Sequence, residues 1–407
     1  MSSNPSEQPA PRLTIVANAR IPGEKAHAIQ IVQMAAAFEP VFTDVRVVFP
    51  CRANTAAMQS VGDPFDYYDV PRAFGLVGLP CIDAVKRVTI DWPLLNRFPF
   101  PLLAHLLQLW TFAFSAFLFV ARLPGGVVYS RDLFVLTVLA LLSRRRDSRF
   151  IFEVHTLPRS GPARRLHLWA ARRADAIVAI SDHLHDWYRD RGFDPSRLLV
   201  ARDGVNLETF AALPDRAAAR ARLGIPAEAR VAAYTGHFYR WKGTDTLAAA
   251  APLLPAPWQV HLVGGIGGDL QRLAGLADGD RLHVHGHLPQ REAIQYAAAA
   301  DVVVLPNSGE SEISADYTSP LKLFEYMASG RPLVASDLPS IREVVRPDEH
   351  ALLVPPDDPA ALAVAIQRLA ADPDLAGRLA ATAREYVTDF TWPVRAHAIA
   401  SFVESLP

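Results

Sequence analysis

Short apolar runs, rich in Val, Ile and Leu, recur along the chain and alternate with longer stretches of helical period. Runs of this kind are typical of strands in parallel sheets that helices cover on both faces. In the first half of the chain they lie at 13–19, 45–50, 126–130, 150–155, 176–181 and 198–204. In the second half they lie at 230–236, 259–265, 282–286, 301–306, 332–336 and 351–356. The repeated pattern predicts an α/β protein with two doubly wound, Rossmann-like domains and a cleft between them.

A change in composition marks the boundary between the two halves. Residues 206–229 are polar, rich in Ala and Arg, and contain two prolines, which indicates a linker with a short helix. We therefore expect an N-terminal domain over 1–205, a C-terminal domain over 206–385 and a final segment over 386–407. Ligands of doubly wound sheets bind beyond the carboxyl ends of the strands, which places the candidate site in the cleft.

One helical stretch is apolar around most of its circumference. Residues 102–121 approach the ~20 residues that span a bilayer. They include His105 and Gln108, however, and they lead directly into the strand at 126–130. A membrane-spanning helix here would disrupt the first domain. Two interpretations remain open: an ordinary buried helix, or a helix on the sheet that makes a peripheral membrane contact through 101–121.

Composition narrows the class of protein. The 407 residues are half apolar, carry a formal net charge of -1 and contain no block of like charge, which argues against a nucleic-acid partner. Two cysteines, Cys51 and Cys81, are too few for a disulfide framework or a zinc site. The polar first residues lack the pattern of a signal peptide. We expect a cytoplasmic protein, associated with a membrane if 101–121 contacts lipid.

The loop after the strand at 230–236 offers groups to an anion. Gly236 ends the strand, His237, Arg240 and Lys242 follow, and a helix begins after Gly243. Cations at the carboxyl end of a strand, close to a helix N-terminus, are well placed to bind a phosphate. A solvated turn with two surface cations is the alternative.

The next two loops are candidates for close contact with a ligand. Gly264 and Gly265 follow a strand, where glycine allows a ligand to approach the backbone. The loop is not a dinucleotide fingerprint, because Leu270 stands where the third glycine belongs. The turn with His287 and Leu288 can present backbone groups to a flat base. No acidic residue stands beside its histidines at ligand spacing, so we expect no metal site there.

The segment 318–330 begins a helix at which two charges need an explanation. Thr318 or Ser319 can cap this helix, and Pro320 suits its first turn. Lysine occurs only at positions 25, 86, 242 and 322, and Lys322 lies in the first turn, where a cation is unfavourable unless an anion is bound. Glu325 stands among apolar residues and could accept two hydrogen bonds from a ribose diol. The alternative is a Lys322–Glu325 surface pair.

Several ordered motifs resemble the retaining glycosyltransferases of family 4, which have the two-domain GT-B fold. The segments that carry the resemblance are 18–38, FEVHTLP at 152–158, DGVNLETF at 203–210, TGHFYRWKG at 235–243, the long segment 319–345, and FTWPVRAHAIASFVESL at 390–406. The resemblance covers nearly the whole chain. It implies that the last helix returns to the N-terminal domain, that the co-substrate is a nucleotide-diphosphate sugar, and that no cofactor is required.

The same resemblance implies roles for individual residues. Lys242 and Arg240 would hold the diphosphate together with the amides from Ser319 to Lys322, including that of Leu321, and Glu325 would bind the ribose. His155 would orient the donor sugar. Gly23, Lys25 and His27 would face the acceptor, a saccharide or lipid-linked hydroxyl group. Transfer would retain the anomeric configuration, and cations with a helix N-terminus would stabilise the leaving group without a metal ion.

The sequence departs from the family pattern at two places. His237 follows Gly236 where the family often has arginine, and Arg240 is the candidate substitute. The family also often has two glutamates eight positions apart. Counting back from Glu325 reaches Tyr317, with Asp316 beside it, so the first acid is absent or displaced and the donor sugar stays open. Two other functions therefore remain as alternatives: a nucleotide-sugar epimerase on the same fold, and a non-catalytic protein that binds nucleotide sugars.

Overall fold

The chain folds into two compact units. The computed structural model describes residues 10–84, 100–142, 147–158, 160–317 and 319–407. The first unit comprises Met1–Ala201 and Trp392–Pro407, and the second comprises Arg202–Thr391. The sequence placed these boundaries at 205/206 and 385/386. The expectation of a linker over 206–229 is wrong, because this segment forms helices α9 and α10 of the second unit and buries Phe210 and Ala219 in its core.

The first unit contains a parallel sheet of seven described strands in the order β3-β2-β1-β4-β5-β6-β7. Six of these strands coincide with apolar runs of the sequence, whereas β3 was not predicted. The elements are β1 (Arg12–Val16), α1 (Ala26–Phe38), β2 (Thr43–Pro50), α2 (Ala56–Gln59), α3 (Pro64–Tyr68), β3 (Gly75–Leu79), α5 (Phe100–Val120), β4 (Gly126–Ser130), α6 (Leu133–Leu142), β5 (Ser148–Val154), α7 (Gly161–Ala171), β6 (Ala176–Ala179), α8 (Asp182–Arg189), η3 (Pro195–Arg197), β7 (Leu198–Val200) and α18 (Trp392–Ser405).

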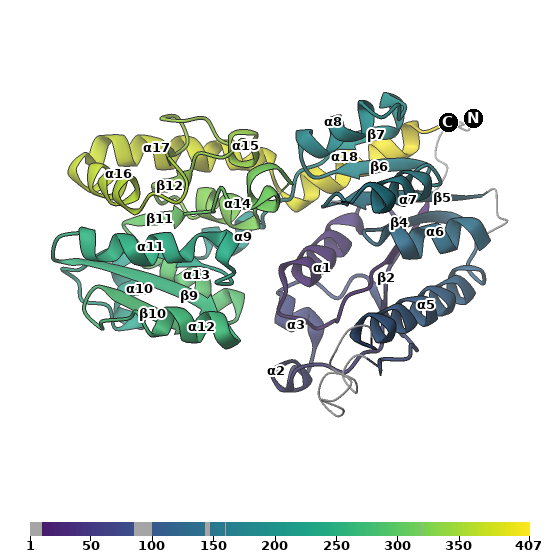
Figure 1. The fold of residues 1–407 in the computed structure, drawn as a ribbon, viewed down its shortest axis with the longest axis horizontal. Helices are drawn as coiled ribbons and strands as arrows, with labels where there is room; N and C mark the ends of the chain where they lie inside the picture. Colours follow the sequence, from purple (N-terminus) through teal and green to yellow (C-terminus); the bar gives the residue numbers. More distant parts are fainter. Residues whose placement is uncertain (1–9, 85–99, 143–146, 159, 318) are drawn as a thin grey trace, which may run out of the picture. The chain divides into compact units, whose positions relative to one another are not determined.

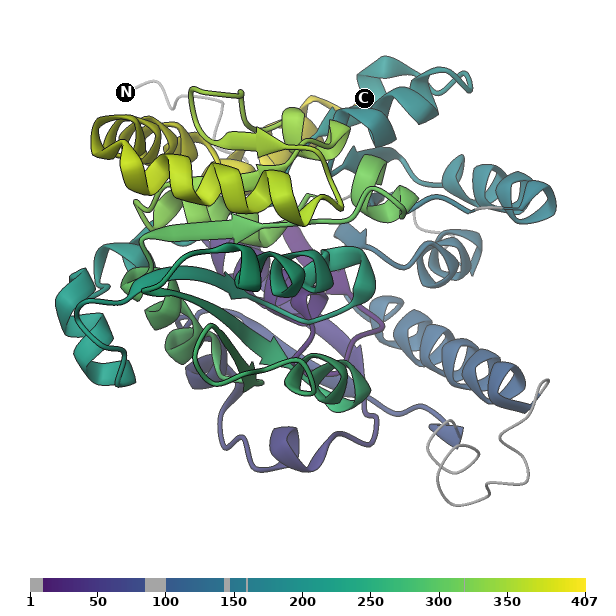
Figure 2. The same cartoon turned by 60° about the vertical axis from the view of Figure 1, so that its left-hand side comes forward.

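Helices cover both faces of this first sheet. α5, α6 and α7 follow one another in a layer on one face, and α1 covers the other face together with α18 (Figure 1 and Figure 2). The last helix of the chain thus packs in the first unit. Because parallel strands need crossover connections, this two-sided covering follows from the sequence order of strands and helices.

The second unit contains a parallel sheet of six described strands in the order β10-β9-β8-β11-β12-β13. Each strand coincides with a predicted run. The elements are α9 (Leu207–Ala211), α10 (Arg216–Leu223), β8 (Arg230–Thr235), η4 (Arg240–Lys242), α11 (Thr244–Ala250), η5 (Ala251–Leu253), β9 (Trp258–Gly265), α12 (Gly267–Ala274), β10 (Leu282–Gly286), α13 (Gln290–Ala299), β11 (Val302–Leu305), η6 (Ile313–Tyr317), α14 (Leu321–Ala328), β12 (Leu333–Ser336), α15 (Pro339–Arg342), β13 (Leu352–Val354), α16 (Pro359–Ala371), α17 (Pro373–Tyr386) and η7 (Val387–Asp389).

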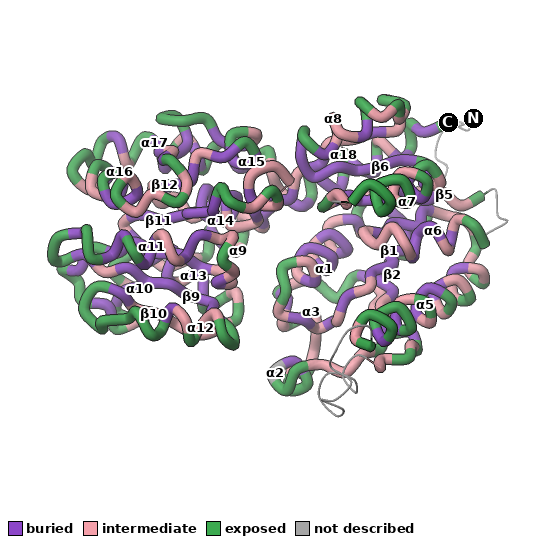
Figure 3. The backbone as a smooth tube through the Cα atoms, viewed as in Figure 1, coloured by how far each residue is buried: buried purple, intermediate pink, exposed green. Residues whose placement is uncertain are grey.

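Alternation along the central strands divides the interior of the second unit into two cores. Val231 and Ala233 of β8 face a core with α10, α13 and α14, whereas Ala232 and Tyr234 face a core with α11 and α16. All four side chains are fully buried, and the central strands of both units are buried along their length (Figure 3). This is the burial that near-continuous apolar runs predict.

Helix α5 is the helix that the sequence left open between two interpretations. Its buried residues are Ala104, Gln108, Phe112, Ala113, Ala116 and Val120, which form a stripe toward the sheet. The side chain of Gln108 is fully buried, and its Nε2 donates to Asn18 Oδ1 at 3.1 Å. The opposite face remains apolar and exposed. Within the part of the chain that the structure describes, α5 is the one helix long and apolar enough to cross a membrane, yet it packs as a layer of the first unit.

Candidate functional site

The loops after β8 and β11 lie where the strand order of the second sheet reverses. β8 pairs with β9 on one side and with β11 on the other, so the helices that follow β8 and β11 leave the sheet in different directions. Doubly wound sheets bind their ligands in the crevice that forms at this point. The loop after β8 carries four of the predicted residues, Gly236, His237, Arg240 and Lys242.

Glycines allow the loop after β8 to pack closely on its neighbours. Gly236 and Gly264 have φ values of 144° and 118°, and a Cβ on Gly264 would lie 2.6 Å from the carbonyl oxygen of Gly236. A Cβ on Gly243 would lie 1.8 Å from the carbonyl oxygen of Pro306. The N–H of Gly236 donates to Val263 O at 2.7 Å. These glycines therefore set the path of the loop, and the amide of Gly236 is already used within the protein.

The second half of this loop is braced from α12. Arg272 donates to the carbonyl oxygen of Phe238 at 2.8 Å and pairs with Asp245 at the start of α11. The ring of Phe238 fills the space beside Gly265, where a Cβ would lie 2.3 Å from it. Gly265 is thus required for loop packing, and Arg272 fixes the position of the turn that carries Lys242.

Lys242 is held in an environment that favours an anion. Its Nζ lies 4.0 Å from the centroid of the Trp241 ring. Burial, and next the charge of Lys322, lower the pKa of Lys242 from 10.5 to about 7. Among the described residues no carboxylate forms an ion pair with Lys242. The Trp241 ring favours the ammonium charge, whereas burial and the neighbouring Lys322 oppose it. A bound anion would offset these two opposing effects. Arg240, in the same turn, is exposed.

Helix α14 brings a second lysine and a buried carboxylate to the same end of the sheet. Lys322 Nζ donates to Glu325 Oε2 at 2.5 Å, and Gln290 Nε2 of α13 donates to Glu325 Oε1 at 3.0 Å. Glu325 is only 7% exposed, so the pair differs from the surface pair that was the alternative. Both carboxylate oxygens are engaged, and a diol that binds Glu325 has to share or replace these hydrogen bonds.

The residues just before α14 have different roles from those predicted. Pro320 stands at the N-cap position, outside the first turn. The Oγ of Ser319 accepts the N–H of Asp203 at 3.1 Å and forms no capping hydrogen bond with α14, so Ser319, one of the two predicted caps, does not cap the helix. Thr318 lies outside the described residues. Leu321, Lys322 and Leu323 occupy the first turn of α14, where a helix presents N–H groups and the positive end of its dipole.

Two further donor-side predictions lie in one short turn. Asp316 and Tyr317 are the last residues of η6, a π-helical turn, and both are partly exposed. A π-turn holds more residues than an α-turn. Counting along the sequence therefore does not decide which of the two side chains takes the position of the missing acid.

The turn with His287 and Leu288 lies against the loop after β8. The rings of His237 and His287 stack, with centroids 6.2 Å apart and planes within 10°. Leu288 packs against the core that α13 and α14 share. The second unit thus brings together the predicted residues of four loops: those after β8, β9 and β10, and the one before α14. Within the described ranges, no group of three or more His, Cys, Asp or Glu side chains is arranged to hold a metal ion.

The first unit places His155 beside a buried carboxylate. The Nε2 of His155 bonds to Glu153 Oε1, and Gln30 Nε2 donates to the same oxygen at 2.8 Å. Arg395 of α18 donates to Glu153 Oε2 at 2.9 Å. Burial alone would raise the pKa of Glu153, but Arg395, then His155 and Arg131, hold it well below its usual range. Burial, and next Arg131, lower the pKa of His155 to about 4, so this imidazole is neutral near pH 7.

The three acceptor-side predictions lie in the loop before α1 and the start of that helix. Gly23 is buried, and the Tyr68 hydroxyl both accepts its N–H (2.6 Å) and donates to its carbonyl oxygen (3.0 Å). Lys25 is exposed at the N-cap position. Burial, then Arg131 and Lys25, lower the pKa of His27 to about 4. Since Arg131 also acts on His155, it links His27 and His155 at one end of the first sheet.

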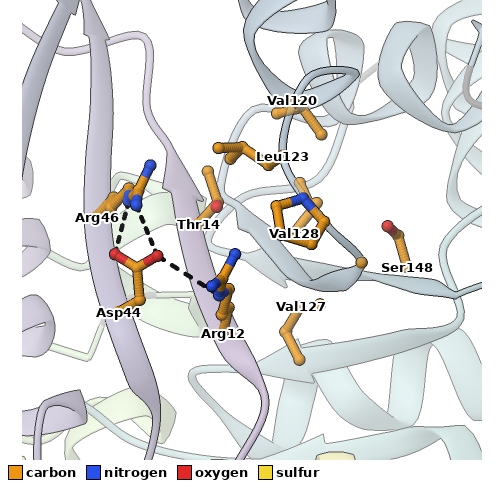
Figure 4. Close-up of a pocket in the computed structure, with 12 residues that line it drawn as sticks. Arg12, Thr14, Asp44, Arg46, Val120, Leu123, Val127, Val128 and Ser148 are labelled. Atoms are coloured by element: carbon orange, nitrogen blue, oxygen red, sulfur yellow. Dashed lines mark hydrogen bonds and ion pairs between the residues drawn. The ribbon is translucent and has the colours of Figure 1, made fainter.

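A pocket of the first unit lies at the opposite edge of its sheet. Figure 4 shows Arg46 holding both oxygens of Asp44, at 2.7 and 2.6 Å, with Arg12 Nε 3.6 Å from the same carboxylate. The pocket is lined by the first residues of β1, β2, β4 and β5. His155 follows the carboxyl end of β5. The pocket is therefore separated from the predicted residues by the length of the strands, and its charges are paired among themselves.

Comparison with known proteins shows which families the chain resembles. The family described as "Glycosyl transferases group 1" matches residues 229–372, and the family described as "Glycosyltransferase Family 4" matches residues 68–209. Each match covers about a third of the chain, which therefore resembles these glycosyltransferases. A D-inositol 3-phosphate glycosyltransferase of Streptomyces bingchenggensis is 33% identical over 248 residues, which cover 56% of this chain and 52% of the relative. The chain thus matches about half the length of this curated relative.

Solved structures show that the fold is GT-B. Anabaena Alr3699/HepE in complex with UDP superposes with a TM-score of 0.70 at 18% identity, covering 97% of this chain and 100% of that one. Sucrose-phosphate synthase of Thermosynechococcus elongatus superposes with a TM-score of 0.73 at 23% identity, covering 97% and 99%. The predictions of a family-4 resemblance and a GT-B fold are confirmed.

The family matches divide the candidate residues into two groups. The group 1 match contains all donor-side candidates from Gly236 to Glu325, and the family 4 match contains His155. The acceptor-side candidates Gly23, Lys25 and His27 precede both matches. Their roles therefore rest on the motif resemblance and on the geometry around Arg131.

Sequence reasoning missed several residues that contact the candidate site residues. Glu153 could have been found from the sequence, because it is a carboxylate in an apolar strand. It stands two residues before His155 and therefore on the same side of the strand. Gln290 and Arg395 could not have been found from the sequence, since their contacts with Glu325 and Glu153 join distant parts of the chain. The hydroxyl of Tyr326 accepts the N–H of Thr235 at 2.7 Å and so joins α14 to the end of β8.

Proposed function

We propose that the protein is a retaining glycosyltransferase. It moves a hexose-type sugar from a nucleoside-diphosphate sugar to a hydroxyl group of a saccharide or lipid-linked acceptor, and its own cations take the role of a metal ion. The observation that carries the proposal is the placement of Lys242 and Lys322 together at the first turn of α14. The names of the relatives support it: a glycosyltransferase of D-inositol 3-phosphate, and an Anabaena protein solved with UDP and with UDP-glucose.

The proposed chemistry is leaving-group stabilisation. Negative charge grows on the β-phosphate as the bond to the sugar breaks, and the two lysines and the N–H groups of α14 favour that charge. Glu325 binds the ribose diol, and His155 orients the sugar. The acceptor hydroxyl attacks from the face that the diphosphate leaves and passes its proton to a phosphate oxygen, so that the anomeric configuration is kept.

Ligand binding and product analysis test this function. Nucleoside diphosphates and their sugars are expected to raise the melting temperature, because a ligand of the folded state stabilises it by mass action. The donor that shifts it most is then incubated with sugar and inositol-phosphate acceptors, and the anomeric configuration of the product is read by NMR. An epimerised donor formed without acceptor would favour the epimerase, and binding without any turnover would favour the non-catalytic protein.

Binding of a nucleoside diphosphate is expected to weaken as the pH rises above about 7. The free Lys242 has a pKa of about 7, and a bound anion raises that pKa. Binding therefore takes up a proton above pH 7, and affinity falls by up to about tenfold per pH unit until the pKa of the complex is reached. Calorimetry between pH 7 and 9, in buffers of different ionisation enthalpy, measures both effects.

A Lys242→Arg variant is the control for this pH dependence. A guanidinium stays protonated throughout this range, so its affinity is expected to be level between pH 7 and 9 with no proton uptake. A wild-type affinity that does not change with pH would contradict the assignment of Lys242 to the anion.

We further propose that the protein is cytoplasmic and docks on anionic lipid through the exposed face of α5, α6 and α7. On α5, Leu103, Trp110 and Phe114 are 54%, 54% and 55% exposed, and Leu141 of α6 and Leu166 of α7 are 53% and 65% exposed. The three helices carry no acidic residue, and α7 adds exposed Arg164 and Arg165. Exposed apolar side chains on three neighbouring helices, together with cations on α7, suit a lipid surface of negative charge.

Co-sedimentation with vesicles tests this contact. The protein is expected to sediment with phosphatidylglycerol vesicles at low salt and to remain in solution after Trp110→Asp and Phe114→Asp are combined. Val364→Asp, at a 66% exposed position of the second unit, is the matched control and should leave sedimentation unchanged. Equal sedimentation of all three proteins, or none by the wild type, would remove the proposal.

A further inference from the structure

Glu153 is a buried charge that the proposed transfer reaction does not use directly. It is 1% exposed, and polar groups from three elements and one loop surround it. The groups around it are Gln30 of α1, Tyr129 of β4, Arg131 after β4 and Arg395 of α18. An ionised carboxylate costs much free energy to bury unless such partners surround it. A buried carboxylate with this many partners therefore suggests a specific role for Glu153.

The two carboxylate oxygens of Glu153 have different tasks. Oε2 accepts from Tyr129 and from Arg395, both of which are buried. Oε1 accepts from Gln30 and contacts Nε2 of His155, which is the one partner of the carboxylate that the family resemblance assigns to the donor sugar. One oxygen is thus fixed by the framework, and the other is presented to the imidazole.

This contact decides which nitrogen of His155 carries the hydrogen. An ionised carboxylate only accepts hydrogen bonds, so Nε2 must donate. The cations Arg395 and Arg131 keep Glu153 ionised, and His155 is neutral near pH 7. A neutral imidazole with its hydrogen on Nε2 has an unprotonated Nδ1, which can accept a hydrogen bond from a sugar hydroxyl group but cannot donate one.

We propose that Glu153 is a positioning residue that fixes the tautomer and the orientation of His155, so that Nδ1 accepts a hydrogen bond from a hydroxyl group of the donor sugar. Arg395 anchors Glu153 in turn. It enters from the first turns of α18, and its Nε also donates to the carbonyl oxygen of Ala201 at 3.2 Å. The position of His155 is therefore set by the last helix of the chain. The hydrogen bond to the donor sugar rests on the proposed function. The tautomer of His155 does not depend on it.

The test replaces Glu153 by glutamine and reads the imidazole directly. A glutamine side chain has the same shape but can donate through its amide, which removes the preference for hydrogen on Nε2. In protein labelled with 15N-histidine, the wild-type His155 signal is expected to show a protonated Nε2 and an unprotonated Nδ1, and Glu153→Gln to lose this state. The signal is assigned by its absence from His155→Gln. In the same variant kcat should fall by roughly twofold to tenfold, the effect of one hydrogen bond between neutral groups, with the donor KM little changed.

Two further variants keep the test decisive. Tyr129→Phe removes a hydrogen bond from the other oxygen of the same carboxylate and should leave the tautomer unchanged. The double variant Glu153→Gln/Arg395→Met removes both buried charges together and serves if the single variant does not fold. Retention of the Nε2–H tautomer in the glutamine variants, or an Nδ1–H tautomer in the wild type, overturns the inference. A wild type with the expected tautomer and no transfer to any acceptor would overturn the proposed function and leave the pairing supported.

Discussion

Replacing Lys242 by alanine is expected to lower the rate of glycosyl transfer by a factor of several hundred. Lys242 lies partly buried beside Lys322, its pKa is lowered to about 7, and no described carboxylate pairs with it. A bound diphosphate is the partner that such a cation lacks. The loss of one preorganised contact to the charge that develops on a leaving group costs roughly 3 kcal/mol, which corresponds to a rate lower by two to three orders of magnitude. Initial rates at saturating donor and acceptor measure this effect.

Two other variants separate a local effect from the loss of one positive charge. Arg230 is exposed and begins β8, the strand whose other end carries the loop with Lys242. Arg230→Ala should therefore leave the rate within about twofold, since charges at exposed positions contribute little. The transfer rate of Arg240→Ala is expected to lie between the rates of these two variants. The exposed Arg240 side chain loses conformational entropy when it binds a ligand, which reduces its contribution. Near-normal turnover of folded Lys242→Ala would refute the diphosphate assignment.

The strands were predictable because burial on both faces of a sheet requires near-continuous apolar runs in the sequence. Every apolar run that was predicted as a strand corresponds to a strand of the structure. β3, with the sequence GLVGL, was missed because two glycines and five residues give neither a long run nor an alternation. The segment 206–229 was mistaken for a linker because its polar helix α10 contributes a single buried charged residue, Arg220, whose partner Asp301 lies far along the chain.

The candidate site was predictable only as far as its residues lie within motifs. Lys242, Lys322 and Glu325 could be named from strand ends and a helix start. The hydrogen bond that Gln290 donates to Glu325 could not be named, because no local pattern marks Gln290. For Ser319 a local pattern was misleading. Its position before α14 is typical of a capping residue, but its hydroxyl group accepts the N–H of Asp203 instead. The local sequence shows which hydrogen bonds a polar side chain could form. Contacts with distant parts of the chain decide which of these it does form.

Glu325→Gln is expected to abolish the preference of the site for a ribose. In the absence of ligand, Glu325 accepts from Lys322 and Gln290, and it lies in a turn whose first residues are proposed to hold the diphosphate. If Glu325 binds the vicinal hydroxyl groups, each hydrogen bond to the charged carboxylate contributes about 1.5–3 kcal/mol. Affinity for a nucleoside diphosphate should then fall by about a hundredfold relative to the affinity for its 2′,3′-dideoxy analogue, because that analogue never made these contacts.

A comparison of the two ligands distinguishes this role from a purely structural one. The charge change in Glu325→Gln also frees Lys322, whose ammonium group then favours the diphosphate of either ligand equally. A structural role would weaken both ligands by the same factor, and relief of the Lys322 pair alone would strengthen both. Only a direct contact with the diol changes the ratio of the two affinities. Gln290→Ala is the matched control: it removes the neighbour that donates to Oε1 but keeps the carboxylate, so the ratio should remain close to that of the wild type. An unchanged ratio in Glu325→Gln would show that the ribose lies elsewhere, even if transfer itself were lost.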